Sequence, residues 1–278
     1  MKYVLTLFAI AFAVQLQAQK VVNKAIIKMK TEITFPENFN PGGGGGAGPD
    51  GNQMQMPRDM ENNSTVWYKG DMTKMENTSD FGTQQVYVDR KNKKTTTLME
   101  MMGRKMGFYS TDADAEAMQK RMDSARNVRR DSLEKMGLSF AKNEPEITYL
   151  DETKKIAGLN CKKAIVKTKG QNGVVNETTV WYSPDFTFGE GFSLGGSGGG
   201  QMRMMGMTPQ GIDKIKGFPM EYEFARQNGM KVHMVVTKVQ LDAEIDDKTF
   251  EIPKGYDIKP MSEMQGPGGG MRFRTIGG

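Results

Sequence analysis

The chain has 278 residues. Its 38 lysines and arginines and 33 aspartates and glutamates give a net charge of +5. This excess is too dilute to indicate nucleic-acid binding. The single cysteine, Cys161, excludes an internal disulfide, and with the single histidine, His233, it is too little for a His/Cys zinc site. We therefore expect a fold that depends on a hydrophobic core and has no cofactor.

The first eighteen residues have the pattern of a signal peptide. Lys2 precedes an apolar run from Tyr3 to Val14, and the small residue Ala18 follows a short polar stretch. The apolar run is shorter than the ~20 residues that a membrane-spanning helix needs. We expect cleavage near Ala18 and export to the periplasm or the medium, without a transmembrane segment.

Residues 23–35 predict a β-strand, because apolar side chains alternate there with lysine, glutamate and threonine. Similar short runs follow at 64–74, 83–89, 94–102, 146–150, 161–168, 174–183, 219–226 and 230–241. Strands at hairpin-like spacing indicate one large antiparallel sheet.

One segment, Asp112 to Met136, has a helical period instead. Its apolar residues recur at steps of three and four, Thr111 or Asp112 can cap its start, and Gly137 can end it. Acidic and basic side chains balance along it, so binding to an anionic membrane surface is not expected. We expect this helical insertion, 112–137, to pack on the sheet through a stripe of methionine, alanine and leucine.

Glycine-rich stretches at 41–51, 189–200 and 266–270 predict loops, because ordering them costs much backbone entropy. We expect a single domain over residues 19–260, with disordered loops at 41–51 and 189–200 and a disordered tail over 261–278. Methionines flank these stretches, among 24 in the chain.

Methionine thioethers are soft ligands that select Cu(I). The sharpest candidate set is Met202, Met204, Met205 and Met207. Methionine is also a common filler of cores and adaptable apolar surfaces, which is the interpretation that we favour.

No catalytic constellation is evident. Cys161 and His233 form a conceivable nucleophile pair, but a lone strand cysteine is more often a small core residue. The acidic run from Asp242 to Asp246 imitates a calcium loop, yet Asp247 stands where the loop needs glycine and Pro253 where it needs glutamate. We therefore do not expect an enzyme.

Four blocks of sequence carry a family resemblance. They are 154–164 (KKIAGLNCKKA), 178–183 (TTVWYS), 215–222 (IKGFPMEY) and 246–256 (DDKTFEIPKGY). Over about Tyr149 to Pro260 the chain resembles exported bacterial proteins of the DUF4412/GLPGLI group, whose function is unknown. Gly217-Phe218-Pro219 departs from the GLPGLI signature, so DUF4412 is the closer match. After the strand that begins near Met230, we expect a turn and a tail pinned by Phe250, Ile252 and Tyr256.

That group looks similar to the LolA/LolB lipoprotein carriers. The resemblance implies a mainly β fold: a large curved antiparallel sheet, or half-barrel, with one long amphipathic helix. It brings no catalytic residues, and in those carriers the concave face receives acyl chains.

We therefore expect a non-catalytic exported binding protein, which could carry an apolar or lipid-like ligand on the concave face. The alternatives are a Met-rich Cu(I)-binding envelope protein and a structural envelope protein without a small ligand. The partner could be an apolar or lipid-like ligand or an envelope protein. The candidate ligand contacts are Met118, Met122 and Leu133 of the helix, facing Phe218, Met220, Tyr222, Val232 and Met234 of the sheet. The same slot could equally be a filled core.

Overall fold

The computed structural model describes residues 19–36, 58–101, 103–135, 144–169, 174–189, 192, 208–226 and 229–264. The strands of the main sheet are β2 (Lys24–Thr34), β3 (Asp59–Lys69), β4 (Met72–Ser79), β5 (Gly82–Asp89), β6 (Lys94–Met101), β7 (Arg104–Thr111), β8 (Glu146–Ile156), β9 (Leu159–Lys169), β10 (Val175–Ser183), β12 (Phe218–Ala225), β13 (Lys231–Leu241) and β14 (Asp257–Pro260). The other elements are β1 (Lys20–Val22), β11 (Phe186–Phe188), the helices α1 (Asp112–Lys135) and α3 (Met261–Met264), and the 3₁₀ turns η1 (Ile212–Lys214) and η2 (Asp247–Phe250).

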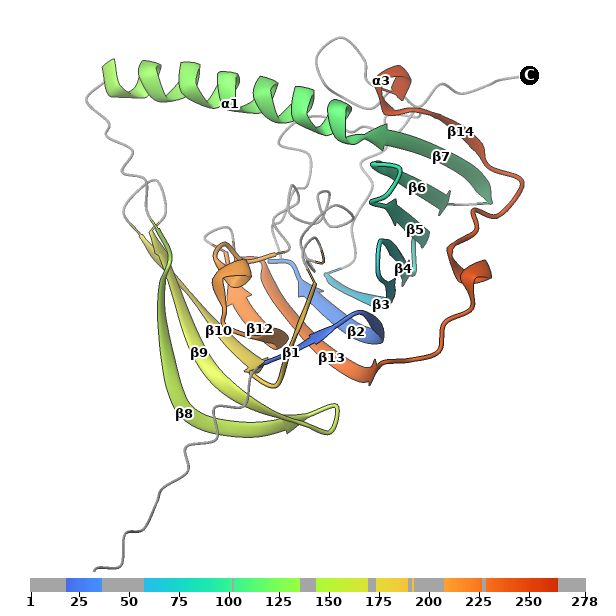
Figure 1. Ribbon diagram of the computed structural model, residues 1–278. Helices are drawn as coiled ribbons and strands as arrows, with labels where there is room; N and C mark the ends of the chain where they lie inside the picture. The colour runs from blue at the N-terminus through green and yellow to red at the C-terminus, as the bar shows by residue number, and fades with distance from the viewer. Residues whose placement is uncertain are drawn as a thin grey trace, which may run out of the picture.

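The twelve strands form one open sheet in the order β14-β7-β6-β5-β4-β3-β2-β13-β12-β10-β9-β8. The sheet bends into a U-shaped half-barrel, with β8 and β9 in one wall and β3 to β7 in the other (Figure 1). Every neighbouring pair is antiparallel except β14 and β7. The predicted mainly β fold with a large curved antiparallel sheet is confirmed.

The short strands β1, β11 and β14 were not predicted, and two further details of the strand prediction are wrong. Residues 64–74 are not one strand, because Gly70 adopts a φ of 56° and turns the chain between β3 and β4. The strand β7 was not predicted, because the segment Arg104–Thr111 lacks a regular alternation of apolar and polar residues.

One face of the sheet carries no charged side chain over seven neighbouring strands, β12 to β6. We call it the uncharged face. Cross-strand pairing places its members on the same side of the sheet. They are Met220, Tyr222 and Phe224 of β12; Val232, Met234 and Val236 of β13; Ala25, Ile27, Met29, Thr31 and Ile33 of β2; Met60, Asn62, Ser64, Val66 and Tyr68 of β3; Thr73, Met75, Asn77 and Ser79 of β4; Gln84, Val86 and Val88 of β5; and Thr95, Thr97 and Met99 of β6.

The core lies on this face, where β1 and β11 pair in parallel and cover the floor of the half-barrel. The ring of Phe188 in β11 lies 5.4 Å from Tyr68 of β3 and 5.1 Å from Phe218 of β12, measured between ring centroids. Since β2 and β13 separate β3 from β12, one ring reaches both only where the sheet curves around it. The uncharged face is therefore the concave face.

The helix α1 follows β7 directly and crosses the open side of the half-barrel (Figure 1). Its start is a reciprocal cap: the Thr111 hydroxyl donates to Asp114 Oδ2 at 2.8 Å, and the Asp114 backbone N–H donates to Thr111 Oγ1 at 3.2 Å. The predicted cap at Thr111 is confirmed, while Gly137 lies outside the described residues.

The predicted packing of a helix stripe on the sheet is not what the described side chains show. Ala125 is exposed, Val128 is 68% exposed, and Met118 is half-buried. The helix therefore spans the opening without lying flat on the sheet. Among the described residues, no helix combines the length and apolar character required to cross a membrane.

The segment after β13 is a strap that crosses the outer face to reach β7. Lys69 Nζ donates to the Ile245 carbonyl at 3.0 Å and pairs with Asp247, and β14 then runs parallel to β7. Phe250 is buried as predicted, whereas Ile252 is 41% exposed and does not pin the strap.

Three other expectations concern residues outside the described part of the chain. They are the loop 41–51, most of the loop 189–200, and the set Met202, Met204, Met205 and Met207. The predicted disordered tail begins too early, because Met261–Met264 forms α3; residues 265–278 are not described.

Candidate ligand-binding hollow

The concave floor of the half-barrel contains all five sheet residues predicted to contact a ligand: Phe218, Met220, Tyr222, Val232 and Met234. Tyr222 pairs with Met234 across the strands, and all five are buried. Burial raises the pKa of the Tyr222 phenol well above its usual value, so this side chain stays neutral. The structure thus brings these five residues together on one apolar surface.

Part of this floor is already covered by protein. Phe218 packs against Phe186 and Phe188 of β11, with ring centroids 5.2 and 5.1 Å apart. At Phe218, the predicted space between the sheet and the helix is therefore filled by side chains of β11. Of the predicted helix contacts, Met118 is half-buried, and the side chains of Met122 and Leu133 are not among those described. Their pairing with the floor stays a prediction.

The wall formed by β3 to β6 extends the uncharged face beyond the predicted residues. Val66, Met75, Val86 and Thr97 form one cross-strand row along this wall. Val66 and Val86 are buried and Met75 is half-buried. Sequence reasoning missed this row because its members are on four strands whose register only the folded sheet reveals.

A polar but uncharged row lies beside the apolar one. Ser64, Asn77 and Gln84 face one another on β3, β4 and β5. The Ser64 hydroxyl donates to Asn77 Oδ1 at 2.7 Å, and Asn77 Nδ2 donates to Gln84 Oε1 at 3.4 Å. Ser64 and Asn77 are each 5% exposed. The wall therefore offers hydrogen-bonding groups without charge.

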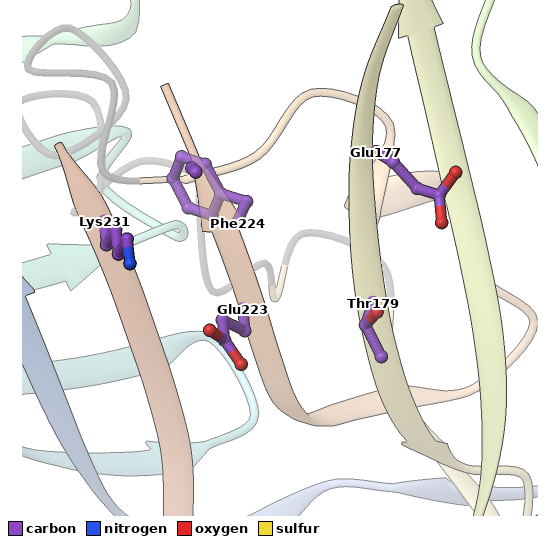
Figure 2. Close-up of a pocket in the computed structure, with 6 residues that line it drawn as sticks. Glu177, Thr179, Glu223, Phe224 and Lys231 are labelled. Carbon is purple, nitrogen blue, oxygen red and sulfur yellow. The ribbon is translucent and has the colours of Figure 1, made fainter. Parts of the chain in front are cut away.

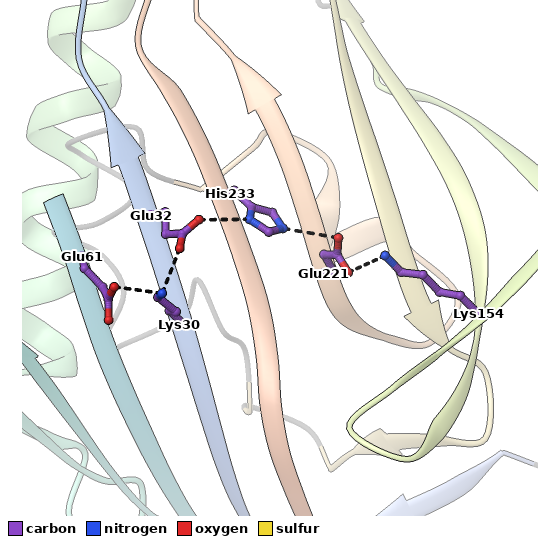
Figure 3. Close-up of polar contacts among 6 residues, drawn as sticks. All are labelled: Lys30, Glu32, Glu61, Lys154, Glu221 and His233. Atoms are coloured by element: carbon purple, nitrogen blue, oxygen red, sulfur yellow. Dashed lines mark hydrogen bonds and ion pairs between the residues drawn. The ribbon is translucent and has the colours of Figure 1, made fainter. Parts of the chain in front are cut away.

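The opposite, outer face carries a charged network that crosses the middle of the sheet (Figure 3). Lys30 pairs with Glu61 at 2.8 Å and with Glu32 at 2.9 Å, and these contacts lower the pKa of both carboxyls. His233 lies 3.5 Å from Glu32 and 3.3 Å from Glu221. The network is completed by a 2.6 Å ion pair between Lys154 and Glu221.

Lys154 also lies over the Trp181 ring, 4.7 Å from its centroid. This cation–π contact supports the ion pair and ties the β8–β9 hairpin to β10 and β12. In the middle of the sheet, the outer face thus carries ion pairs, whereas the inner face packs apolar side chains.

A small depression of about 320 Å³ also lies on the outer face, across β10, β12 and β13 (Figure 2). Its lining includes Glu177, Thr179, Glu223 and Lys231. Glu177 lies 3.5 Å from Lys167 and is half exposed, so the depression is a solvated, mixed-charge surface. Such a surface lacks the mostly apolar lining that is typical of small-molecule sites.

The structure gives no support for Cys161 and His233 as a nucleophile pair. Cys161 is fully buried, its thiol donates to the Leu159 carbonyl at 3.6 Å, and burial raises its pKa to about 11. The thiol is therefore protonated at neutral pH, while both His233 ring nitrogens face carboxylates.

The acidic residues of the rejected calcium loop have structural roles. Asp246 caps η2 by accepting from the Lys248 backbone N–H at 2.9 Å, and Asp242 pairs with Lys20. Across the described residues, no three or more histidine, cysteine, aspartate or glutamate side chains are grouped to hold a metal ion.

The fold defines an open half-barrel β protein whose concave face carries no charged side chain over seven neighbouring strands. The chain belongs to the DUF4412 family, a domain of unknown function, whose model matches residues 52–256. The family match begins well before Tyr149, so it includes β3 to β7 and α1 as well as the four sequence blocks, whereas β1 and β2 precede it. No curated protein matches this chain.

Solved structures of low similarity include PNGF-II, with 18% identity and a TM-score of 0.35 over 85% of this chain and 31% of that chain. MucB in complex with MucA(peri) matches with 8% identity and a TM-score of 0.34, over 83% of this chain and 55% of MucB. A domain assigned as an outer membrane lipoprotein-sorting protein from Vibrio parahaemolyticus matches with 10% identity and a TM-score of 0.29. The match covers 82% of this chain and 89% of that domain. The chain thus spans about a third of PNGF-II and about half of MucB, and its function has to follow from its own surface chemistry.

Proposed function

We propose that this protein is a non-catalytic exported binding protein that holds an apolar or lipid-like ligand in the hollow between the uncharged face and α1. The observation that carries the proposal is the absence of charge on the concave face over seven strands. Lysines and glutamates occupy the intervening positions of the same strands, such as Lys30, Glu32, Lys74 and Glu76, and face outward. The charge asymmetry therefore follows the curvature of the sheet.

The concave wall suits hydrocarbon for an energetic reason. Each methylene group that leaves water for an apolar surface contributes about 0.8 kcal/mol, whereas burying an unpaired charge is strongly unfavourable. Half-buried Met75, flanked by the buried side chains of Val66 and Val86, offers such a surface on the wall. Met75 adds an unbranched side chain that adapts to irregular shapes.

The helix α1 suits the role of a cover. It is anchored through the Thr111–Asp114 cap at the end of β7 and crosses the open side of the half-barrel. A helix whose side chains stay in solvent gains little from tertiary packing and is marginally stable. A ligand beneath it would supply the packing that its described side chains lack.

Export is part of the proposal. The apolar leader ends at Ala18, and the next residue already takes part in the fold: Gln19 Nε2 donates to the Phe186 carbonyl at 3.1 Å. Cleavage near Ala18 would therefore leave the hydrogen bonds of β1 intact.

The test is native mass spectrometry of protein purified from the cell envelope. We expect a mature chain that starts at Gln19 and carries a co-purified lipid-like ligand. Met75→Glu, on the concave face of β4, should lower ligand occupancy about tenfold, because it places a charge in the hollow. Thr78→Glu, on the outer face of the same strand, should leave occupancy unchanged.

Circular dichroism would confirm that Met75→Glu is folded. Ser79→Asp, at a half-buried concave position, serves as a second variant if it is not. Equal occupancy in the concave and outer variants would contradict the proposal, and copper in place of lipid would favour the metal alternative.

A further inference from the structure

We infer that the ligand is an uncharged amphiphile whose ester, amide or hydroxyl group lies against the polar row Ser64–Asn77–Gln84. The inference rests on the proposed function and names the chemistry of its ligand. It starts from three polar side chains that face one another on adjacent strands, directly beside the row of Val66, Met75 and Val86.

The row has a buried part and a more accessible part. Ser64 and Asn77 are buried and satisfy each other through the 2.7 Å hydrogen bond. Gln84, at the β5 end, is half-buried and accepts from Asn77. The buried pair therefore fixes the orientation of the Gln84 side chain, which is the member placed to meet a ligand.

Neighbouring positions extend the same chemistry. Asn62 and Ser79 pair directly across β3 and β4, one step along the uncharged face, and both are half-buried. Amide and hydroxyl groups donate and accept, so they match a carbonyl or a hydroxyl of a ligand. Together with the row they form a neutral hydrogen-bonding patch beside the hydrocarbon-like row of Val66, Met75 and Val86.

Charge decides between a neutral amphiphile and a free fatty acid. A carboxylate or phosphate drawn into the hollow would need a cationic partner to offset its lost hydration. The strand positions around the polar row supply none, since the lysines of these strands, such as Lys30 and Lys74, face outward. Arg90 lies beyond the other end of β5, where its guanidinium contacts Thr73 and the Tyr68 ring. The polar part that reaches the row is therefore neutral.

The experiment compares two probes with the same acyl chain, monodecanoylglycerol and decanoate, on delipidated full-length mature protein at pH 8. Affinity is measured by displacement of a neutral apolar dye. We expect monodecanoylglycerol to bind at least about tenfold more tightly, because ionised decanoate must bring its charge into an uncharged hollow.

Two substitutions at adjacent residues locate the effect. Gln84→Met removes the hydrogen-bonding group on the concave side, and Gln85→Met makes the same change on the outer side of β5. Gln84→Met should weaken monodecanoylglycerol binding about three- to tenfold, which corresponds to one hydrogen bond, and should leave dye binding unchanged. Gln85→Met should change neither.

If Gln84→Met does not fold, Asn62→Leu and its outer-face neighbour Asn63→Leu form an equivalent pair. Equal binding of both probes, or equal effects of the concave and outer variants, would overturn the inference while the proposed apolar site stands. Failure of both probes and of the dye to bind would overturn the proposed function as well.

Discussion

At the scale of residues, polar side chains find partners on both faces of the sheet, through ion pairs on the outer face and through neutral hydrogen bonds on the inner face. On the outer face Lys30 holds Glu32 and Glu61 and raises its own pKa in doing so, because both hydrogen bonds favour its charged form. On the inner face Ser64 and Asn77 satisfy each other without charge. Burial penalises charge, so ion pairs stay where water reaches them.

Cys161 gives a prediction at this scale. Its burial raises the thiol pKa from 9.0 to about 11, which lowers the thiolate fraction about a hundredfold at pH 8. Labelling with a disulfide reagent should therefore be very slow in the native protein and become faster as pH rises. The urea-unfolded chain is the control and should react at once. Rapid labelling of the folded protein would show that Cys161 is accessible.

At the scale of elements, α1 depends on its first turn more than on tertiary packing. The Thr111–Asp114 cap satisfies backbone donors at the helix start and lowers the pKa of Asp114. The described side chains beyond this turn are exposed except for Met118. The cap therefore sets where the helix leaves β7 and in which direction.

Thr111→Ala should destabilise α1 by about 1 kcal/mol, because the helix start loses its hydroxyl cap. Far-UV circular dichroism during a urea titration should show the helical signal declining earlier than in the unmodified protein. Ser124→Ala, at an exposed position inside the helix, is the matched control and should have no effect or a slightly stabilising one. Equal behaviour of the two variants would contradict the role of the cap.

At the scale of the whole molecule, the strap after β13 connects the middle of the sheet to its edge strand, β14. The strap covers the outer face of the wall, and β14 completes the sheet beside β7, the strand that anchors α1. Gly107 of β7 accommodates this approach, because a Cβ there would lie 3.0 Å from Ile258 and 2.8 Å from Leu98. The last described strand and the helix anchor are thus mechanically linked.

Phe250→Ala should lower the free energy of unfolding by about 3 kcal/mol or more, because it removes a buried ring from the strap. Ile252→Ala, two residues further on, should change it by no more than about 0.5 kcal/mol, since that side chain is exposed. Chemical denaturation of both variants provides the measurement. Similar losses in the two would mean that the strap does not pack as described.

Much of the site could be anticipated, and the rest could not for identifiable reasons. Alternation alone places Phe218, Met220 and Tyr222 on one side of their strand, because the side-chain period of a strand is two. The polar row was missed because Ser64, Asn77 and Gln84 come together only through the register of three strands. The helix contacts stay a prediction, because the side chains of Met122 and Leu133 are not among those described.

By itself, the sequence determined the local structure of this protein: the alternation within strands, the helix and its Thr111 cap, and which residues of a strand share a face. These properties depend on neighbours a few residues apart. Only the tertiary structure decided that β2 pairs with β13, that Phe188 bridges Tyr68 and Phe218, and that α1 crosses the opening. Such pairings join distant parts of the chain, and they are settled by packing of the whole sheet, which no local pattern records.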